Sequence, residues 1–230
     1  MPILSGPRLA PAQGTATHLV VLCHGYGADG NDLIGLAPHW QRLLPGAAFV
    51  APNAPERCAA GPGHQWFPIS RLEPAAMREG VEAAAATLDA FLDAELARMG
   101  LPGERLALVG FSQGTMMSLH VGMRRKQRPA AIVGYSGLLA DVNIPQSSNA
   151  PPVLLVHGDS DPMIPMQYLF ASAGALGRAG VGVQWHISPD TPHAIDEGGL
   201  LLGGVFLAMA LGGLLPSADS AISCPLGCSR

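Results

Sequence analysis

Charged residues are scarce in this chain of 230 residues: they make up 13% of it, with 17 acidic against 13 basic side chains. The resulting net charge of -4 gives no basic face of the kind that binds nucleic acid. The one basic run, Arg124-Arg125-Lys126 followed by Arg128, is interpreted as the solvated end of a helix. We therefore expect no nucleic-acid partner.

Cysteine is also rare, and the four residues present are too scattered for a disulfide framework. Cys23 falls within an apolar run, whereas Cys224 and Cys228 lack the spacing and partner ligands of a zinc site. We expect free thiols and no structural metal. The N-terminus lacks the cationic start and long apolar stretch of a signal peptide, which favours a cytoplasmic protein.

Long hydrophobic runs are absent but for one interval, residues 198–218, which carries no charge and approaches the length of a membrane-spanning helix. Paired glycines at 198–199, 203–204 and 212–213 weaken a helix there. The interval also begins where the last helix covering a sheet is expected. We therefore favour burial against a sheet, without stable insertion into a membrane.

What the chain does have is a 48% hydrophobic content, enough for one large core, and a regular alternation of strands and helices. Short, nearly continuous apolar runs are typical of parallel strands covered on both faces. They lie at residues 18–23, 48–51, 106–109, 130–135, 153–157 and 183–187. Helical sequence spans 74–99, follows Ser112, separates the last two strands and follows His193.

The fold class is therefore α/β, with a mostly parallel central sheet in a three-layer α-β-α arrangement. We expect one domain over residues 1–230, because no segment resembles a linker. Residues 212–230 form an atypical tail whose sequence predicts no helix or strand, and disorder is one interpretation of it.

The most informative stretch is 106–114, where an apolar strand leads into a G-x-S-x-G turn and then into helical sequence. Such a turn is so sharp that positions two before and two after the serine leave no room for a side chain. Gly110 and Gly114 occupy those positions around Ser112. The pattern predicts that Ser112 is a nucleophile.

A serine needs a histidine to accept its proton and a carboxylate to orient the imidazole. Asp159 and Asp161 follow the strand at 153–157, and His193 follows the strand at 183–187. The order Ser, Asp, His is that of the α/β-hydrolase arrangement. Spacing alone does not separate the two aspartates.

Two other glycine-containing segments have competing interpretations. Residues 25–30 match the dinucleotide pattern G-x-G-x-x-G, but Pro38 interrupts the helix that should follow and Ala51-Pro52-Asn53 lacks the acidic ribose ligand. A loop whose backbone N–H groups face the serine is the better interpretation. Ser136 lacks a glycine at plus two, which favours a turn serine that donates to the backbone.

Together these motifs resemble the phospholipase/carboxylesterase family, the bacterial carboxylesterases related to acyl-protein thioesterases. The matching segments cover most of the chain. They are Leu22-Cys23-His24-Gly25-Tyr26-Gly27, Gly110-Phe111-Ser112-Gln113-Gly114, His157-Gly158-Asp159-Ser160-Asp161-Pro162 and His193-Ala194-Ile195. The resemblance selects Asp161 over Asp159 as the carboxylate.

The resemblance also implies an oxyanion hole formed by the backbone N–H groups of Tyr26 and Gln113. Trp66 and Phe67 resemble the aromatic pair that lines the family's acyl channel, although a core role fits them equally well. Relatives are often dimers, so the apolar stretch 205–211 is either a homodimer interface or core.

The expected function is therefore hydrolysis of carboxylic esters with short to medium acyl chains, without a cofactor. An acyl-protein thioesterase or a lysophospholipase would use the same triad, so the triad cannot separate these substrates. A catalytically silent binding protein of the same fold is a remote alternative. A nucleotide-dependent oxidoreductase is not supported, because residues 25–30 lack the following helix and the acidic ribose ligand of a dinucleotide site.

Overall fold

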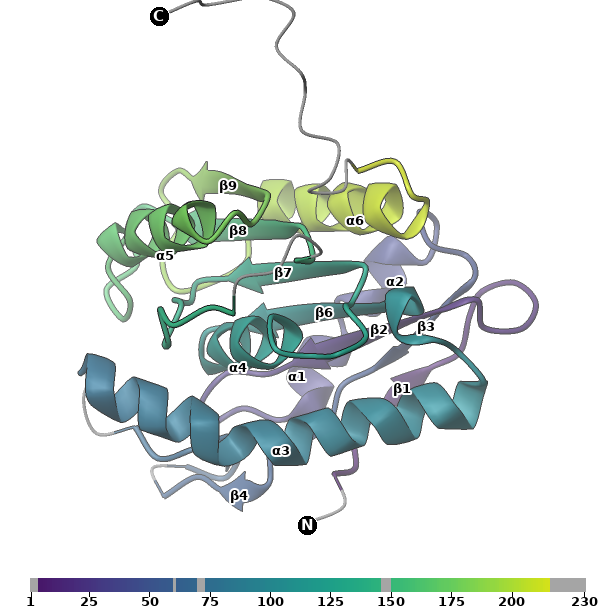
Figure 1. Ribbon diagram of the computed structural model, residues 1–230, viewed down its shortest axis with the longest axis horizontal. Helices are drawn as coiled ribbons and strands as arrows, with labels where there is room; N and C mark the ends of the chain where they lie inside the picture. The colour runs from purple at the N-terminus through teal and green to yellow at the C-terminus, as the bar shows by residue number, and fades with distance from the viewer. Residues whose placement is uncertain (1–3, 60, 70–72, 146–149, 216–230) are drawn as a thin grey trace, which may run out of the picture.

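The computed structural model describes residues 4–59, 61–69, 73–145 and 150–215, which form one seven-stranded sheet with helices on both faces (Figure 1). The sheet contains β1 (Arg8–Leu9), β2 (His18–Cys23), β3 (Ala47–Val50), β6 (Leu106–Phe111), β7 (Ala131–Tyr135), β8 (Val153–Gly158) and β9 (Val183–Ser188). The helices are α1 (Gly30–Ile34), α2 (Ala37–Trp40), α3 (Pro74–Met99), the 3-10 helix η1 (Gly103–Arg105), α4 (Gln113–Gly122), α5 (Gln167–Arg178) and α6 (Glu197–Leu211).

The strand order is β1-β3-β2-β6-β7-β8-β9, and all neighbours are parallel except β1, which pairs antiparallel with β3. Strands β2, β3, β6, β7 and β8 are almost wholly buried, as their continuous apolar sequences predict. The α/β-hydrolase fold is confirmed. The carboxyl ends of the parallel strands lie along one edge of the sheet, which we call the catalytic rim.

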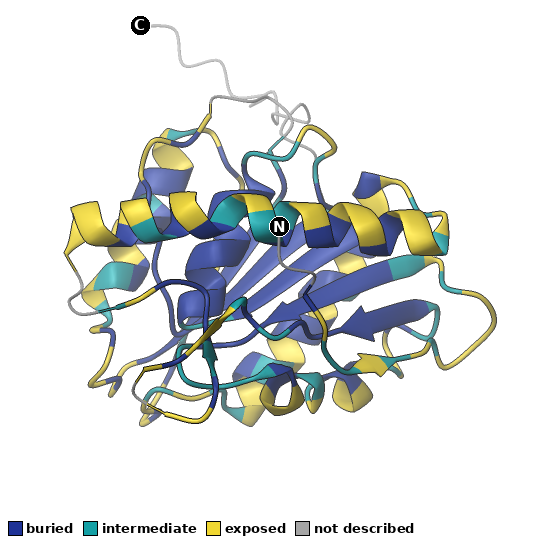
Figure 2. Ribbon diagram, turned by 90° about the horizontal axis from the view of Figure 1, so that it is seen from below, coloured by how far each residue is buried: buried dark blue, intermediate teal, exposed yellow. Residues whose placement is uncertain are grey.

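Each face of the sheet has its own hydrophobic core. One core is formed with α3, α4 and α5, and the other with α1, α2 and α6. Figure 2 shows the strands buried between the two layers, with the exposed residues of α3 turned outward. This is the three-layer arrangement that the sequence predicts.

Helix α3 has the bounds expected from the sequence. Pro74 stands at its start, where a missing N–H costs nothing, and Gly100 ends it in the left-handed region with φ 65°. Met77, Val81 and Leu88 recur on one buried face at helical spacing.

Helix α6 packs against the sheet, as expected for the uncharged interval. Cβ atoms at Gly203 and Gly204 would lie 1.9 Å from the Tyr135 hydroxyl and 2.5 Å from the Trp40 ring, so these glycines permit the close approach. The two rings also donate to backbone carbonyls of the helix, those of Gly199 and Leu200. Within the described residues, no helix is long and apolar enough to cross a membrane. Residues 216–230 of the expected tail lie outside the described part of the chain.

Outside the main sheet, β4 (Glu56–Arg57) pairs with β5 (His64–Gln65). The helix that follows Ser112 ends at Gly122. The basic run after it differs from the expectation at one residue: Lys126 is exposed, but the Arg125 side chain is only 5% exposed and pairs with Asp89 and Asp93 of α3. Carboxylates on a helix distant in sequence replace water around this arginine.

Candidate active site

Ser112 occupies a sharp turn between β6 and α4. Its backbone lies in the left-handed region with φ 54° and ψ -116°, which is unfavourable for a residue with a side chain by about 1–2 kcal/mol. A Cβ atom at Gly110 would lie 2.3 Å from the carbonyl oxygen of Gly114, and one at Gly114 would lie 1.8 Å from that of Cys23. Both glycines are therefore required by close backbone contacts.

The turn is held by hydrogen bonds to the neighbouring strand β7. The amide of Ser112 donates to the carbonyl of Tyr135 at 2.9 Å. The hydroxyl of Thr115 lies 2.9 Å from the same carbonyl oxygen and 2.9 Å from that of Gly110. The strained serine is thus fixed from both sides, which is how a folded protein maintains an unfavourable backbone conformation.

The structure brings Asp161 to His193. Their Oδ2 and Nδ1 atoms are 2.7 Å apart, while Asp161 Oδ1 accepts from the amides of Met163 and Ile164 at 2.8 and 2.9 Å. Asp159 instead is exposed and accepts from the hydroxyl of Ser160. The carboxylate is buried and fully hydrogen-bonded, which keeps the proton on Nδ1 and leaves Nε2 free to act as a base.

The histidine lies beside the serine turn. The ring of His193 packs against that of Phe111, the residue before Ser112, with centroids 4.9 Å apart. The loop after β2 also approaches the serine: a Cβ atom at Gly25 would lie 3.3 Å from the Cβ atom of Ser112. Segments that follow β2, β6, β8 and β9 therefore meet at the catalytic rim, as expected for parallel strands.

Two further residues hold the loops that carry Asp161 and His193. The hydroxyl of Ser136 donates to the carbonyl of Ala194 at 3.2 Å, confirming a turn serine bonded to the backbone. Its own φ is 44°, so this residue too is held in the left-handed region. His157 lies 2.7 Å from the carbonyl oxygen of Ile164 and 3.4 Å from Asp161 Oδ2, and it ties the aspartate loop to β8.

The loop containing Tyr26 is also fixed. The buried His24 donates from Nδ1 to the carbonyl of Gly25 and accepts at Nε2 from the amide of Ala54, so its tautomer is assigned by its partners. Burial lowers the pKa of His24 and keeps the ring neutral. The amide of Gly27 donates to the carbonyl of His64 at 2.8 Å. These bonds fix the loop against the serine turn without using the Tyr26 amide.

The side chain of Gln113 makes contacts that the sequence did not reveal. Its side-chain oxygen accepts from the amide of Trp66 at 2.9 Å, and its nitrogen donates to the carbonyl of Phe67 at 2.7 Å. The Trp66 indole donates to the carbonyl of His24. Trp66 and Phe67 are 1% and 2% exposed and belong to the core under α3, so their direct part in an acyl channel remains a prediction.

Two largely apolar hollows lie near the serine turn. One, of about 360 Å³, lies between the start of α3, the segment after β7 and the start of α5, with Met77, Leu138 and Tyr168 in its wall. We call it the α3-side hollow. A second, of about 330 Å³, lies beside α1 and includes Gly25, Phe111 and Ile195. We call it the α1-side hollow.

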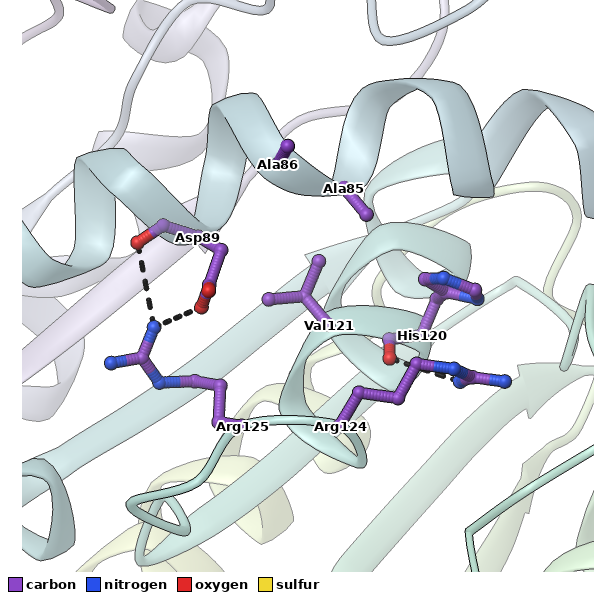
Figure 3. A pocket seen from close by; sticks show the side chains of 7 residues that line it. All are labelled: Ala85, Ala86, Asp89, His120, Val121, Arg124 and Arg125. Carbon is purple, nitrogen blue, oxygen red and sulfur yellow. Dashed lines mark hydrogen bonds and ion pairs between the residues drawn. The ribbon is translucent and has the colours of Figure 1, made fainter.

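A third hollow, of about 210 Å³, lies away from the rim between α3 and α4. Figure 3 shows Arg125 turned toward Asp89 and Arg124 bonded to the carbonyl of His120. The charged groups around it pair with one another, and we call this set the α3–α4 cluster. Its members are Asp89, Asp93, His120, Arg124, Arg125 and Asp141.

No group of three or more His, Cys, Asp or Glu side chains in the described ranges is arranged to hold a metal ion. Cys23 and Cys58 are free thiols, and burial raises the pKa of Cys23 to about 12, so it stays protonated. In the glycine loop that matches the dinucleotide pattern, the amide of Gly30 is occupied by the side chain of Asn53, 2.8 Å away.

Comparison with known proteins agrees with this geometry. A family model described as phospholipase/carboxylesterase matches residues 5–209. An acyl-protein thioesterase 1 of Gibberella zeae is 29% identical over 208 residues, covering 82% of this chain and 88% of that protein. The esterase YpfH of Escherichia coli is 30% identical over 184 residues, covering 79% and 78%. The crystal structure of esterase PE8 superimposes with a TM-score of 0.84 at 41% identity, covering 90% and 98%.

Proposed function

The chain belongs to the phospholipase/carboxylesterase family and is a hydrolase of the esterase and thioesterase type, and we propose that it cleaves carboxylic esters with Ser112, His193 and Asp161. The observation that supports this most strongly is the buried Asp161–His193 hydrogen bond of 2.7 Å beside a serine in the left-handed region. A strained, glycine-flanked serine next to an oriented imidazole is the arrangement that activates a hydroxyl for acyl transfer.

In the proposed reaction, Ser112 Oγ attacks the ester carbonyl while His193 Nε2 takes its proton. Asp161 orients the imidazole and stabilises its positive charge. The oxyanion is held by the backbone N–H groups of Tyr26 and Gln113, the second of which begins helix α4. The alcohol leaves with the proton from His193, and water attacks the acyl-enzyme with the same residue as base. Each step needs only side chains and amides of this chain.

The proposed substrates are esters of short to medium acyl chains, and the α3-side hollow is a suitable site for the acyl chain. Gly137, which precedes the Leu138 of its wall, lies so close to the serine turn that a Cβ there would be 2.8 Å from the carbonyl oxygen of Ser112. Thioester and lysophospholipid hydrolysis are the second candidates, since one relative is named an acyl-protein thioesterase.

We further propose that the chain acts as one domain in the cytoplasm. Whether it forms a homodimer is a separate prediction. Helix α6 has exposed apolar side chains on its outer face, among them Leu201, Val205 and Met209. These are the residues to examine if two copies associate.

The proposal is tested with p-nitrophenyl butanoate and the Ser112→Ala variant. We expect the variant to fold and to lose activity by ~10⁵-fold or more, because a single triad residue carries nearly the whole effect. Ser160→Ala, at an exposed serine bonded to Asp159, is the matched control and should keep its activity. Full activity in folded Ser112→Ala would contradict the mechanism. A panel of simple esters, lysophospholipids and acylated peptides then ranks the substrate classes.

A further inference from the structure

The α1-side hollow is lined by residues that neighbour Ser112 and His193 in the sequence. Its apolar wall includes Leu33, Leu36 and Phe111, and it is closed by Ala194 and Ile195. These last two residues directly follow His193, and Phe111 packs on the His193 ring. Gly25 lines the same hollow and approaches the serine turn. The hollow therefore begins where the base and the nucleophile meet.

The mechanism decides which part of an ester lies on this side. When the tetrahedral intermediate collapses, the bond between the carbonyl carbon and the alcohol oxygen breaks, and His193 Nε2 gives its proton to that oxygen. The acyl group stays on Ser112 Oγ. The leaving oxygen must lie within hydrogen-bond reach of His193, so the rest of the alcohol extends toward the residues beside the histidine.

The charges around the hollow limit the alcohols that it can hold. Asp32 lines it, and Asp29 lies next to it in a capping box at the start of α1. Among the residues described, the hollow is lined by no lysine or arginine, and His24 in its wall is kept neutral by burial, which lowers its pKa. An alcohol that carries a carboxylate or a phosphate would meet like charge there without a partner.

We propose that the α1-side hollow is the subsite for the alcohol group of the ester and selects neutral, apolar alcohols, such as benzyl alcohol, over charged ones. This inference rests on the proposed function, because it assumes that Ser112 and His193 act on an ester. It separates two of the candidate substrates: esters of neutral apolar alcohols are favoured over lysophospholipids, whose leaving group carries a phosphate.

The test compares methyl, benzyl and para-carboxybenzyl butanoate, whose acyl groups are identical. The alcohols have similar acidity, so the intrinsic ease of bond breaking differs little among them. We expect kcat/KM for the benzyl ester to exceed that for the methyl ester by about tenfold or more, the usual gain from filling an apolar pocket. The para-carboxybenzyl ester should fall below the benzyl ester by about fivefold or more, as like-charge repulsion requires.

Leu36→Trp fills the hollow and should reduce the ratio of kcat/KM for benzyl to methyl ester by about tenfold. Leu201→Trp, the same substitution on the outer face of α6 at a side chain 61% exposed, should leave the ratio unchanged. Should Leu36→Trp fail to fold, Leu36→Ala enlarges the hollow and should raise the relative rate for a naphthylmethyl ester. Asp32→Asn keeps an acceptor for the Asp29 amide and should restore part of the rate for the para-carboxybenzyl ester.

The outcomes separate the two proposals. If the unmodified enzyme hydrolyses neither methyl nor benzyl butanoate, ester hydrolysis itself is wrong. If it hydrolyses both, and neither substitution at Leu36 changes the preference among alcohols by more than twofold, the enzyme is an esterase and the alcohol subsite is overturned. A preference that shifts with Leu36 and with Asp32 but not with Leu201 supports the subsite.

Discussion

Two histidine–aspartate pairs, His193–Asp161 and His120–Asp141, differ in almost every respect that matters for chemistry. At the catalytic rim, His193 and Asp161 are 2.7 Å apart. In the α3–α4 cluster, His120 Nδ1 and Asp141 Oδ2 are 3.8 Å apart, and Asp141 is instead bonded to Arg124 and to the amide of Asn143. The side chain of His193 is 19% exposed, whereas that of His120 is 4% exposed.

The difference shows that burial and charge alone do not mark an active site. The carboxylate oxygens of Asp141 accept hydrogen bonds from Arg124 and from the amide of Asn143, so Asp141 does not orient the ring of His120. Burial, reinforced by the charge of Arg124, lowers the pKa of His120 to about 4. A base must accept a proton near its working pH and reach a nucleophile. His193 lies beside Ser112, whereas the cluster around His120 stabilises the contact between α3 and α4.

The largest expected contrast is in activity. Asp161→Asn should lower kcat by ~10⁴-fold, because the amide no longer holds the productive tautomer of His193. Its side-chain oxygen can still accept from the amides of Met163 and Ile164, which preserves the loop. Asp141 lines the α3-side hollow but touches no reacting group, so Asp141→Asn should leave kcat within about threefold and any effect on acyl-chain binding should appear in KM. Steady-state kinetics on one ester measures kcat for both variants. Similar decreases in kcat would contradict the distinction between the two pairs.

The second contrast is in stability, where Asp141→Asn should have the larger effect and Asp161→Asn the smaller. Asp141→Asn leaves the partly buried Arg124 without its carboxylate and should lower the free energy of unfolding by about 3 kcal/mol. For a chain of this size, that corresponds to a decrease in Tm of roughly 6–12 °C. Asp161→Asn should cost less. Denaturant and thermal unfolding of both variants test this, and a stable Asp141→Asn protein would show that the cluster contributes little.

The third prediction concerns pH. Below its ordinary pKa of 6.5, His120 takes up a proton in the unfolded chain, but the folded chain binds that proton only near a pKa of about 4. Stability is therefore lost as pH falls between these values, by about 3 kcal/mol, and this contribution is constant above and below them. His120→Gln should reduce the slope of unfolding free energy against pH in this window. An unchanged slope would mean that the ring is accessible to protons.

The smallest expected effect concerns Ser136, the second serine with a backbone in the left-handed region. Ser136→Ala removes the hydroxyl that donates to Ala194 while keeping the strained φ of 44°. It should lower the free energy of unfolding by about 1 kcal/mol, the usual net value of such a bond. Ser136→Gly loses the same bond but relieves the backbone, so it should be more stable than Ser136→Ala. The reverse order would show that the backbone conformation is not strained.

Much of the fold and the site could be predicted because the signals are local. The buried strands are continuous apolar runs, and α3 has a proline start and a glycine end, so its bounds match the expectation. The serine turn is specified by Gly110 and Gly114 within five residues. Local sequence also limited the carboxylate to Asp159 or Asp161.

The remainder depends on contacts between segments distant in sequence. Asp161 is distinguished from Asp159 by the amides of Met163 and Ile164, which close a turn that spacing does not encode. Strand β1 has two residues and exists only because β3 offers an open edge. The Gln113 side chain binds a segment nearly fifty positions away, and no pattern around the serine announces it.

The central claim, that Ser112 is the nucleophile oriented by this particular histidine–aspartate pair, is tested most directly by covalent labelling. The enzyme is treated with an organophosphonate ester probe, digested and examined by mass spectrometry. We predict a single phosphonate adduct on the peptide containing Ser112, its absence in Ser112→Ala and much slower formation in Asp161→Asn than in Asp141→Asn. An adduct on another serine, such as Ser136, or equal labelling rates in the two aspartate variants, would contradict the assignment.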